Sequence, residues 1–350
     1  MSKWKVGVVG LQRGRVFIDV FNAHPKTEVV AICDINEELL ESVGKSLNLG
    51  DGQKFISFDD FLTKSPLDIV VIATPIEFHT EQTIKSLEAG KDVLCEQTVA
   101  YTVSDCERIV EAVKKTGRVY MMAENYIYFH YLREWKNIID SGKLGKIVYA
   151  ENEYLNPIVP LLVDEKTGKF SWRATRAPIW YCAHSIGPLL HLTGDRIVKA
   201  MGILSDFQSF PQYKEYIGFV DAEIAIFQTQ KGTIIKVITS NVSPRGHLIY
   251  YSLYGTNGYL ESPRKGEEGL MFIKGEMNAP IPFPCKTVDR EGIEGLPEFY
   301  MIEDFLKAVE SRSRPPIDVI RAMDFTVPGL IAHESALSGG KWLDVPLFEW

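Results

Sequence analysis

Short apolar runs alternate with amphipathic stretches through the first 125 residues of the chain. The apolar runs are continuous, which is typical of strands that are buried on both faces of a parallel sheet. Between them, apolar residues recur three and four positions apart, as they do on the buried face of a helix. This rhythm predicts a doubly wound parallel sheet. Its predicted strands are Lys5–Val9, Glu28–Cys33, Asp68–Ala73, Asp92–Cys95 and Val119–Met122.

The pattern changes after Asn125. One more helix is predicted at 131–140, and the later segments alternate apolar and polar residues, as long strands joined by tight turns do. We therefore expect an N-terminal domain at 1–125 and a C-terminal α/β domain at 126–350, built on a large, mostly antiparallel open sheet. The predicted strands of this second domain are 146–154, 218–228, 233–241 and 248–254, followed by helices at about 300–311 and 319–338.

Composition narrows the class of protein. The 350 residues are 45% hydrophobic and 24% charged, which is ordinary for a soluble globular chain. A formal net charge of −8 argues against a nucleic-acid partner, because such proteins need a basic face. No apolar run approaches the roughly 20 residues of a membrane span, and the first residues contain no signal-peptide core. We expect a cytoplasmic protein without a membrane partner.

Cysteines and histidines form no ligand pattern. The five cysteines are odd in number and contain no C-x-x-C pair, which fits reduced thiols rather than a disulfide or zinc framework. The histidines at 130, 191, 247 and 333 lack the clustered spacing of metal ligands. No metal is predicted.

A glycine-rich turn follows the first predicted strand and leads into a helix. A helix N-terminus offers free backbone amides to a pyrophosphate, and an acid about 20 residues further on can accept hydrogen bonds from the adenosine ribose. Asp34 stands in that place, at the end of the second strand. The turn departs from G-x-G-x-x-G, because Gln12 and Arg15 occupy glycine positions and Gly14 comes one place early. The residues predicted to cradle the pyrophosphate are Gly10, Leu11, Gln12, Arg13, Gly14 and Arg15.

These residues predict a dinucleotide site, although the same glycines could simply make a tight turn. Asp34 would repel a ribose phosphate, which favours NAD, whereas Arg13 and Arg15 leave NADP open. Ligands of a doubly wound sheet bind outside the carboxyl ends of its strands. The further candidates for the cofactor are therefore Thr74, Pro75, Glu96, Gln97 and Asn125, and also His79, for which a structural hydrogen-bonding role is the preferred interpretation.

A second cluster lies in the C-terminal half. Trp172 and Arg173 precede Trp180, Tyr181 and His184, and His184 opens a predicted helix. A histidine near a helix N-terminus tends to stay neutral, which suits a general base, and a tyrosine three residues earlier could donate or accept a second proton. On spacing alone, a buried core histidine with packing aromatic residues fits equally well.

Short motifs recur along the chain at 6–10, 31–34, 72–75 with His79, 87–96, 141–146 and 332–340. Together they resemble the glucose-fructose oxidoreductase, inositol dehydrogenase and MocA family (Gfo/Idh/MocA), over nearly the whole chain. This resemblance implies an N-terminal NAD(P)-binding Rossmann domain at 1–125 and a C-terminal α/β domain at 126–350 for substrate binding and oligomerisation.

Two departures from the family pattern bear on the chemistry that the resemblance implies. Dehydrogenases of the family carry Glu-Lys-Pro after the fourth strand, and the lysine assists proton transfer at the nicotinamide end. Here the triplet is Glu96-Gln97-Thr98, and a neutral amide cannot exchange a proton at neutral pH. His184 matches the family's histidine base, but Trp180 stands where an aspartate is usual.

One branch of the family offers a different reaction. The stretch 181–188, with Trp172-Arg173 and Asn125-Tyr126, is similar to the NAD-dependent glycosidases related to α-N-acetylgalactosaminidase. In that branch hydride leaves C3 of the sugar, H2 becomes acidic, the C1 substituent is eliminated, water adds and hydride returns. A tyrosine base for H2 and a histidine near the sugar hydroxyl fit this scheme.

Three functions follow as hypotheses. The first is an NAD(P)-dependent oxidoreductase that acts on a sugar, polyol or related carbohydrate. It uses His184, Tyr181 and Gln97 at the reacting centre, with Tyr126, Trp172, Arg173 and Trp180 toward the substrate. The second is the redox-assisted glycosidase, and the third is a nucleotide-binding sensor that has lost catalysis. We further expect a homodimer or homotetramer formed through the C-terminal sheet.

Overall fold

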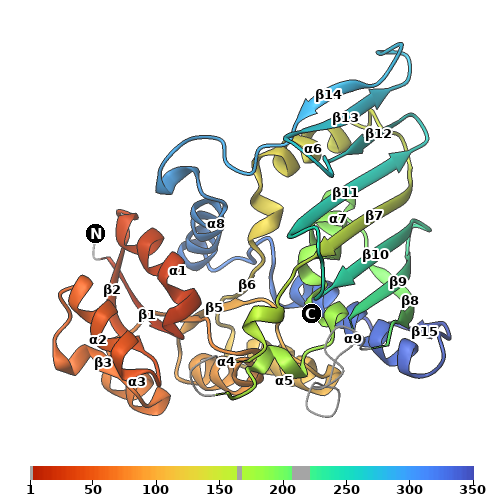
Figure 1. Ribbon diagram of the computed structural model, residues 1–350. Coiled ribbons are helices and arrows are strands. Elements are labelled where there is room, and N and C mark those ends of the chain that lie inside the picture. Colours follow the sequence, from red (N-terminus) through yellow and green to blue (C-terminus); the bar gives the residue numbers. More distant parts are fainter. Residues whose placement is uncertain (1–2, 164–167, 207–220) are drawn as a thin grey trace. The chain divides into compact units, whose positions relative to one another are not determined.

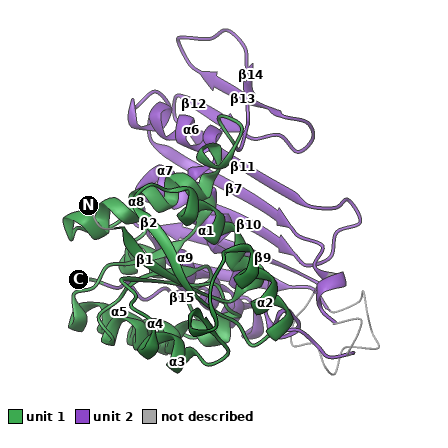
Figure 2. Cartoon of the chain, turned by 90° about the vertical axis from the view of Figure 1, so that its left-hand side faces the viewer, with its two compact units in different colours: residues 1–125, 288–323, 349–350 green, residues 126–287, 324–348 purple. Residues whose placement is uncertain are grey.

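The computed structural model describes residues 3–163, 168–206 and 221–350, and the chain forms two compact units (Figures 1 and 2). The first unit comprises residues 1–125, 288–323 and 349–350, and the second comprises 126–287 and 324–348. No helix within the described ranges is both long enough and apolar enough to cross a membrane.

The first unit is built on a six-stranded sheet in the order β3-β2-β1-β4-β5-β6, with every pair of neighbours parallel (Figure 1). This order confirms the doubly wound sheet of the Rossmann fold. The central strand β4 is apolar throughout because helices cover both faces of the sheet, and all four of its residues are fully buried. The strands are β1 (Trp4–Val9), β2 (Thr27–Cys33), β3 (Lys54–Phe55), β4 (Ile69–Ile72), β5 (Asp92–Glu96) and β6 (Tyr120–Ala123).

Helices follow the strands of this sheet in sequence. Side chains cap several of them, as when Asn36 accepts a hydrogen bond from the Leu39 amide at the start of α2. The helices are α1 (Leu11–Ala23), α2 (Glu37–Ser46), α3 (Phe58–Lys64), α4 (His79–Glu88) and α5 (Val103–Thr116).

A late segment of the chain also belongs to the first unit. The sequence places all of 126–350 in the second domain, whereas the structure groups 288–323 with the first unit. The reason is α8 (Pro297–Ser311), which packs on α1, and His24 Nε2 lies 2.6 Å from Glu303 Oε1. Just beyond α8, Arg312 donates to both carboxylate oxygens of Asp92 at 2.8 Å. Such contacts between distant segments leave no trace in local periodicity.

The second unit contains a nine-stranded sheet in the order β14-β13-β12-β11-β7-β10-β9-β8-β15. Only the β7 and β10 neighbours are parallel among its pairings, which confirms the mostly antiparallel sheet. Residues 218–220 of the strand predicted at 218–228 lie outside the described residues, and the remainder falls in β9. The strands are β7 (Ile147–Leu155), β8 (Ile197–Leu204), β9 (Ala222–Thr229), β10 (Ile234–Ser240), β11 (Leu248–Gly255), β12 (Gly258–Glu261), β13 (Glu268–Ile273), β14 (Ile281–Pro284) and β15 (Leu343–Asp344).

Helices α6 (His130–Asp140) and α7 (Ala183–Thr193) lie behind this sheet in Figure 1, and α7 contacts β7. Strand alternation separates the two faces: Ala150, Asn152 and Tyr154 of β7 are buried toward the helices, whereas Tyr149 and Glu153 point to the other face. The remaining long helix is α9 (Val319–Leu337).

Close packing of α9 on β8 generates a stability prediction. A Cβ built at Gly202 would lie 2.1 Å from the Ala332 carbonyl oxygen, so Gly202→Ala must push the helix from the strand. We expect it to lower the free energy of unfolding by about 1–3 kcal/mol, the usual cost of overpacking. Urea denaturation followed by circular dichroism measures this. Gly52→Ala, where nothing lies within 4 Å, is the control, and equal midpoints for the two variants would contradict the packing argument.

Candidate functional site

The turn after β1 has no room for a side chain. Gly10 has a φ of +85°, and a Cβ there would lie 2.5 Å from the carbonyl carbon of Ala73. Four residues on, a Cβ at Gly14 would lie 2.8 Å from Val8 Cγ1, so α1 packs closely on β1. Gly14 therefore allows the close packing of helix on strand that the third glycine of G-x-G-x-x-G provides, and Arg15 is exposed. This accounts for the departure at the third glycine position of the fingerprint.

Asp34 lies at the end of β2, beside the start of α1. Its Oδ2 accepts a hydrogen bond from the Leu11 amide at 2.7 Å, and its Oδ1 accepts one from the Asn36 amide at 2.8 Å. Within the described part of the chain no side chain caps α1, and Gln12 in its first turn is exposed. An uncapped helix start beside a fixed carboxylate is the arrangement that a dinucleotide requires.

A polar network joins several predicted cofactor residues. The guanidinium of Arg13 pairs with the Glu96 carboxylate and lies 3.5 Å from Glu298 Oε1. Asn125 Nδ2 donates to the same Glu298 oxygen at 2.9 Å. Asn125 is 9% exposed, and its Oδ1 is a buried acceptor that has no hydrogen-bond partner among the residues that the structure describes. A donor such as the nicotinamide carboxamide would satisfy this atom, so the residues present fit the cofactor.

The other predicted residues of this half lie at the ends of β4 and β5. Thr74 Oγ1 donates to Gln82 Oε1 at 2.7 Å, and Pro75 beside it is partly exposed. His79 is 1% exposed, and its two ring nitrogens each lie 2.8 Å from a carbonyl oxygen, of Thr74 and Thr98. Burial lowers the pKa of His79, against the effect of those carbonyl groups. This geometry favours the structural interpretation of His79.

Gln97 is 3% exposed, and its Oε1 accepts a hydrogen bond from Thr98 Oγ1 at 3.2 Å. Its backbone amide donates to Glu96 Oε2 at 3.0 Å. The side chain at the position where the resemblance implies a lysine is therefore a buried, neutral amide that accepts a hydrogen bond from a neighbouring hydroxyl.

His184 is the centre of an aromatic cluster in the second unit. Its ring stacks on Tyr126 with centroids 3.8 Å apart and planes 9° apart, and Phe129 stacks behind Tyr126 at 4.5 Å. The Tyr181 ring meets it edge-on at 5.2 Å. The hydroxyl of Tyr251 on β11 donates to the His184 carbonyl and so ties the start of α7 to the sheet. The structure thus brings together three of the predicted residues, Tyr126, Tyr181 and His184.

Three residues that the sequence did not single out complete this cluster. Tyr154 of β7 lies 5.6 Å from the His184 ring, and His247 meets Tyr154 edge-on at 5.8 Å. Arg176 is 2% exposed and places its guanidinium 4.1 Å from the Tyr181 ring centroid, within the range of a cation–π contact. One of the three could have been found from the sequence: side chains alternate between the two faces of the predicted strand 146–154, and this alternation turns Tyr154 toward the core.

Burial sets the charge of these neighbours. Desolvation raises the pKa of Tyr154 well above its ordinary value, and the adjacent phenols of Tyr126 and Tyr181 add to the rise, whereas Arg176 opposes it. Burial also lowers the pKa of His247, with a smaller contribution from His184. Tyr154 and His247 are therefore neutral hydrogen-bonding groups at neutral pH.

Trp172, Arg173 and Trp180 lie at the margin of this cluster. The Arg173 guanidinium lies 4.5 Å from the Trp172 ring centroid, and Arg176 reaches the same ring at 6.0 Å. Trp180 does not take the place of an acid near His184: its indole meets the His333 ring edge-on at 5.2 Å. All three side chains are half-buried, so a ligand can still reach them.

Comparison with known proteins assigns both halves of the chain to one family. Residues 4–124 match the profile described as an oxidoreductase family with an NAD-binding Rossmann fold, and residues 132–261 match the GFO/IDH/MocA C-terminal domain. The chain belongs to the Gfo/Idh/MocA family. The expected family is confirmed, and with it an NAD-binding fold in the first unit.

Curated proteins whose sequences are similar to this Gfo/Idh/MocA chain carry the name glycosyl hydrolase family 109 protein. The protein from Shewanella putrefaciens is 28% identical over 286 residues, which are 74% of this chain and 62% of that protein. The one from Solibacter usitatus is 23% identical over 385 residues, covering 98% and 88%. The chain thus spans less than two thirds of the length of the Shewanella relatives.

Solved structures with this fold include dehydrogenases. Levoglucosan dehydrogenase in complex with NADH and L-sorbose has a TM-score of 0.85 at 20% identity, covering 99% of this chain and 100% of that one. The myo-inositol 2-dehydrogenase of Lactobacillus plantarum has a TM-score of 0.79 at 22% identity with the same coverage. At these identities the likeness establishes the fold.

The Asp34 carboxylate generates a prediction about cofactor choice. Asp34→Asn keeps an oxygen acceptor for the Leu11 amide but removes the charge that would repel a 2′-phosphate. We expect the ratio of NADP to NAD affinity to rise roughly tenfold, or about 1.4 kcal/mol, measured by calorimetric titration of both cofactors. Asp19→Asn, an exposed carboxylate on α1, is the control. An unchanged ratio in Asp34→Asn would remove Asp34 from the ribose site.

Proposed function

We propose that this chain is an NAD-dependent oxidoreductase that oxidises a hydroxyl group of a sugar, polyol or related carbohydrate. NAD, when bound, accepts the hydride that leaves the carbon bearing that hydroxyl. The turn from Gly10 to Arg15 and the Asp34 carboxylate would hold the adenosine diphosphate end. Asn125, Thr74 and Pro75 would hold the nicotinamide end, with Glu96 and Gln97 beside it.

The cluster around His184 supports this assignment more than any other feature. An imidazole stacked on one phenol and edged by another can take the hydroxyl proton on a ring nitrogen while the phenols donate hydrogen bonds to substrate oxygens. Aromatic rings also suit the apolar faces of a sugar. The side chains that would contact the substrate are those of Trp172, Arg173, Trp180 and Tyr126. Gln97 would hold a substrate hydroxyl without exchanging a proton.

His184→Ala tests the proton acceptor. We expect turnover to fall by about 10²–10⁴-fold, the usual contribution of general base catalysis, with an unchanged Kd for NAD. The assay incubates purified protein and NAD with myo-inositol, levoglucosan and L-sorbose, and follows reduced nicotinamide by absorbance. His191→Ala, two turns along the same helix, is the control. A His184→Ala variant with full turnover would contradict the assignment, and wild-type protein that binds NAD but oxidises nothing would favour the sensor hypothesis.

A second candidate function is the redox-neutral glycosidase. The buried Gln97 in the lysine position and the phenol of Tyr181 near His184 favour it, because this reaction needs a base for a sugar C–H. The same incubation, supplied with aryl glycosides, distinguishes the two functions. NAD-dependent aryl release without net reduction, and solvent deuterium at C2 of the product, would replace the first proposal by the second.

We also propose that the protein works in the cytoplasm as a homodimer or homotetramer. All five cysteines are free thiols, which suits a reducing compartment, and burial raises the pKa of Cys33 to about 12.

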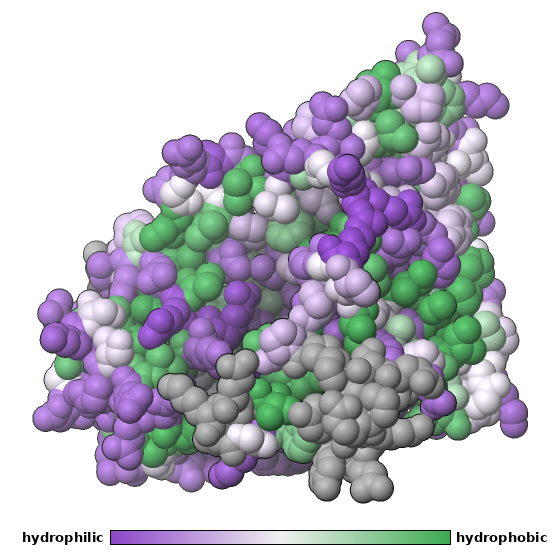
Figure 3. Space-filling model, in the orientation of Figure 1, coloured by the Kyte–Doolittle hydropathy of each residue, from purple (hydrophilic) through white to green (hydrophobic). Residues whose placement is uncertain are grey.

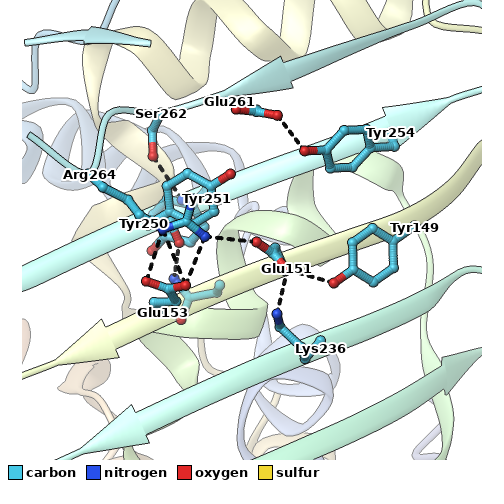
Figure 4. A network of polar contacts seen from close by, with 11 residues as sticks. Tyr149, Glu151, Glu153, Lys236, Tyr250, Tyr251, Tyr254, Glu261, Ser262 and Arg264 are labelled. Carbon is cyan, nitrogen blue, oxygen red and sulfur yellow. Dashed lines mark hydrogen bonds and ion pairs between the residues drawn. The ribbon is translucent and has the colours of Figure 1, made fainter. Parts of the chain in front are cut away.

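The face of the nine-stranded sheet that points away from α6 and α7 supports the oligomer. Figure 3 shows apolar residues over the region of β8, β9 and β10, and strand register aligns isoleucines there, of which Ile203 is exposed and the others are half-buried. Beside them lies a polar network in which Glu151 accepts from Tyr149 and pairs with Lys236 at 2.7 Å and Arg264 at 3.1 Å (Figure 4). A mixed apolar and charged face is typical of a subunit interface. The isoleucines are Ile203, Ile224, Ile226, Ile234 and Ile238.

Ile224→Glu tests the interface. Residue 224 pairs across the sheet with Ile203 and Ile238, so a carboxylate there would be buried among apolar side chains on association, and we expect the variant to be monomeric at micromolar concentration. Light scattering coupled to size-exclusion chromatography gives the mass. Gln230→Glu, exposed beyond the end of β9, is the control. A monomeric wild type, or an Ile224→Glu variant of unchanged mass, would contradict the proposed interface.

A further inference from the structure

The turn that carries Trp180 and Tyr181 is a short 3-10 helix, η6 (Pro178–Tyr181), directly before α7. The first backbone amides of any helix lack partners within it, and Ala177 offers no side-chain cap here. Pro178 has no N–H. The next amide, of Ile179, donates instead to Glu223 Oε2 at 2.9 Å, in a buried hydrogen bond to a strand 44 residues away.

Glu223 is unusual for its position in the sheet. It lies on the core-facing side of β9 with Ala225 and Phe227, both fully buried, and it is itself 2% exposed. A buried carboxylate costs several kcal/mol unless its oxygens are bonded, so such a residue needs partners for both of them. One oxygen takes the Ile179 amide, and the other lies 2.6 Å from His333 Nδ1.

His333 links the Glu223 carboxylate to the side chain of Trp180. A carboxylate beside Nδ1 fixes the orientation of an imidazole ring, as it does for histidines that serve metals and catalytic triads. The fixed ring meets the Trp180 indole edge-on, at 5.2 Å and 78°. Glu223 thus holds the backbone of the turn directly and one of its side chains through His333. The next residue, Tyr181, is the one that meets the His184 ring.

We propose that Glu223, with His333, is a positioning residue that fixes the turn Pro178–Tyr181 and so sets Tyr181 against His184. This inference rests on the proposed function for its catalytic consequence. The acid that the family usually carries at position 180 has no equivalent within this turn, and the carboxylate that controls the turn comes from β9. Glu223 does not touch the reacting atoms in this scheme.

The experiment compares Glu223→Leu, which removes both acceptors, with Glu223→Gln, which keeps one for the Ile179 amide. Hydrogen–deuterium exchange of peptides covering 171–183, read by mass spectrometry, reports the turn without any turnover. We expect Glu223→Leu to exchange these amides about tenfold faster, and Glu223→Gln to stay near wild type, since a lost hydrogen bond opens the amide locally. Asp324→Asn, a buried carboxylate of the same unit paired with Arg196, is the control.

Kinetics then test positioning. On the substrate found for the wild type, we expect Glu223→Leu to lower kcat about tenfold or more with the Kd for NAD unchanged, and Glu223→Gln to restore most of it. In a Tyr181→Phe background the same substitution should have less effect, because coupled residues are not additive. If Glu223→Leu does not fold, His333→Asn carries both measurements, with smaller expected changes.

Unchanged exchange in folded Glu223→Leu would overturn the proposal, and so would additive effects of Glu223→Leu and Tyr181→Phe. Faster exchange with full turnover would reject the positioning role while leaving the proposed function intact. A wild type without turnover on any carbohydrate would defeat the proposed function alone, and exchange would then decide whether Glu223 controls the turn.

Discussion

Backbone crowding where β1 meets β4 is the constraint on which the candidate cofactor site depends. The strand order of the first sheet reverses between these two strands, and ligands of such sheets bind outside the carboxyl ends at that point. Gly10 lies there with its amide on the Cys33 carbonyl at 2.9 Å and its Cα against Ala73. A side chain would not fit here, and only because residue 10 is glycine can the chain turn directly into α1. The start of that helix then lies within 2.7 Å of the Asp34 carboxylate.

The second unit depends on strand register in a comparable way. Consecutive residues of β7 serve opposite faces: Tyr154 lies in the cluster around His184, and Glu153 belongs to the polar network of the other face. A slip of one residue would exchange these faces, since side chains alternate along a strand. The cross-strand pairing of Tyr154 with Ile249 and of Glu153 with Tyr250 therefore fixes both the candidate substrate site and the candidate interface.

Sequence reasoning succeeded where the signal was local. Continuous apolar runs located the parallel strands, and the resemblance of short motifs identified the family. It failed where chain segments meet at long range. Glu223 and Ile179 are 44 residues apart, and the local sequence around either residue does not indicate that they form a hydrogen bond. In the sequence Arg176 looks like an ordinary loop cation, and only the fold shows that it is buried against the Tyr181 ring. The departure at Gly14 became intelligible only when its distance to Val8 was known.

The charge states around His184 bear on which reaction the cluster suits. Burial raises the pKa of Tyr154 well above its ordinary value, so this phenol stays protonated at neutral pH and donates hydrogen bonds. Burial lowers the pKa of His247, which makes it a weaker base than an ordinary histidine. Oxidation of a hydroxyl needs one proton acceptor and donors for nearby oxygens, and His184 with these neutral neighbours can supply both.

Elimination from a sugar requires a second base in addition to the proton acceptor for the hydroxyl. A base must take a proton from carbon, and a phenol that stays protonated is an acid rather than a base. Tyr181 would have to supply that base, helped by the Arg176 guanidinium 4.1 Å from its ring. The dehydrogenase requires fewer changes of charge in this cluster than the glycosidase does. For that reason the oxidoreductase is the first proposal, although the curated relatives carry the name of the second.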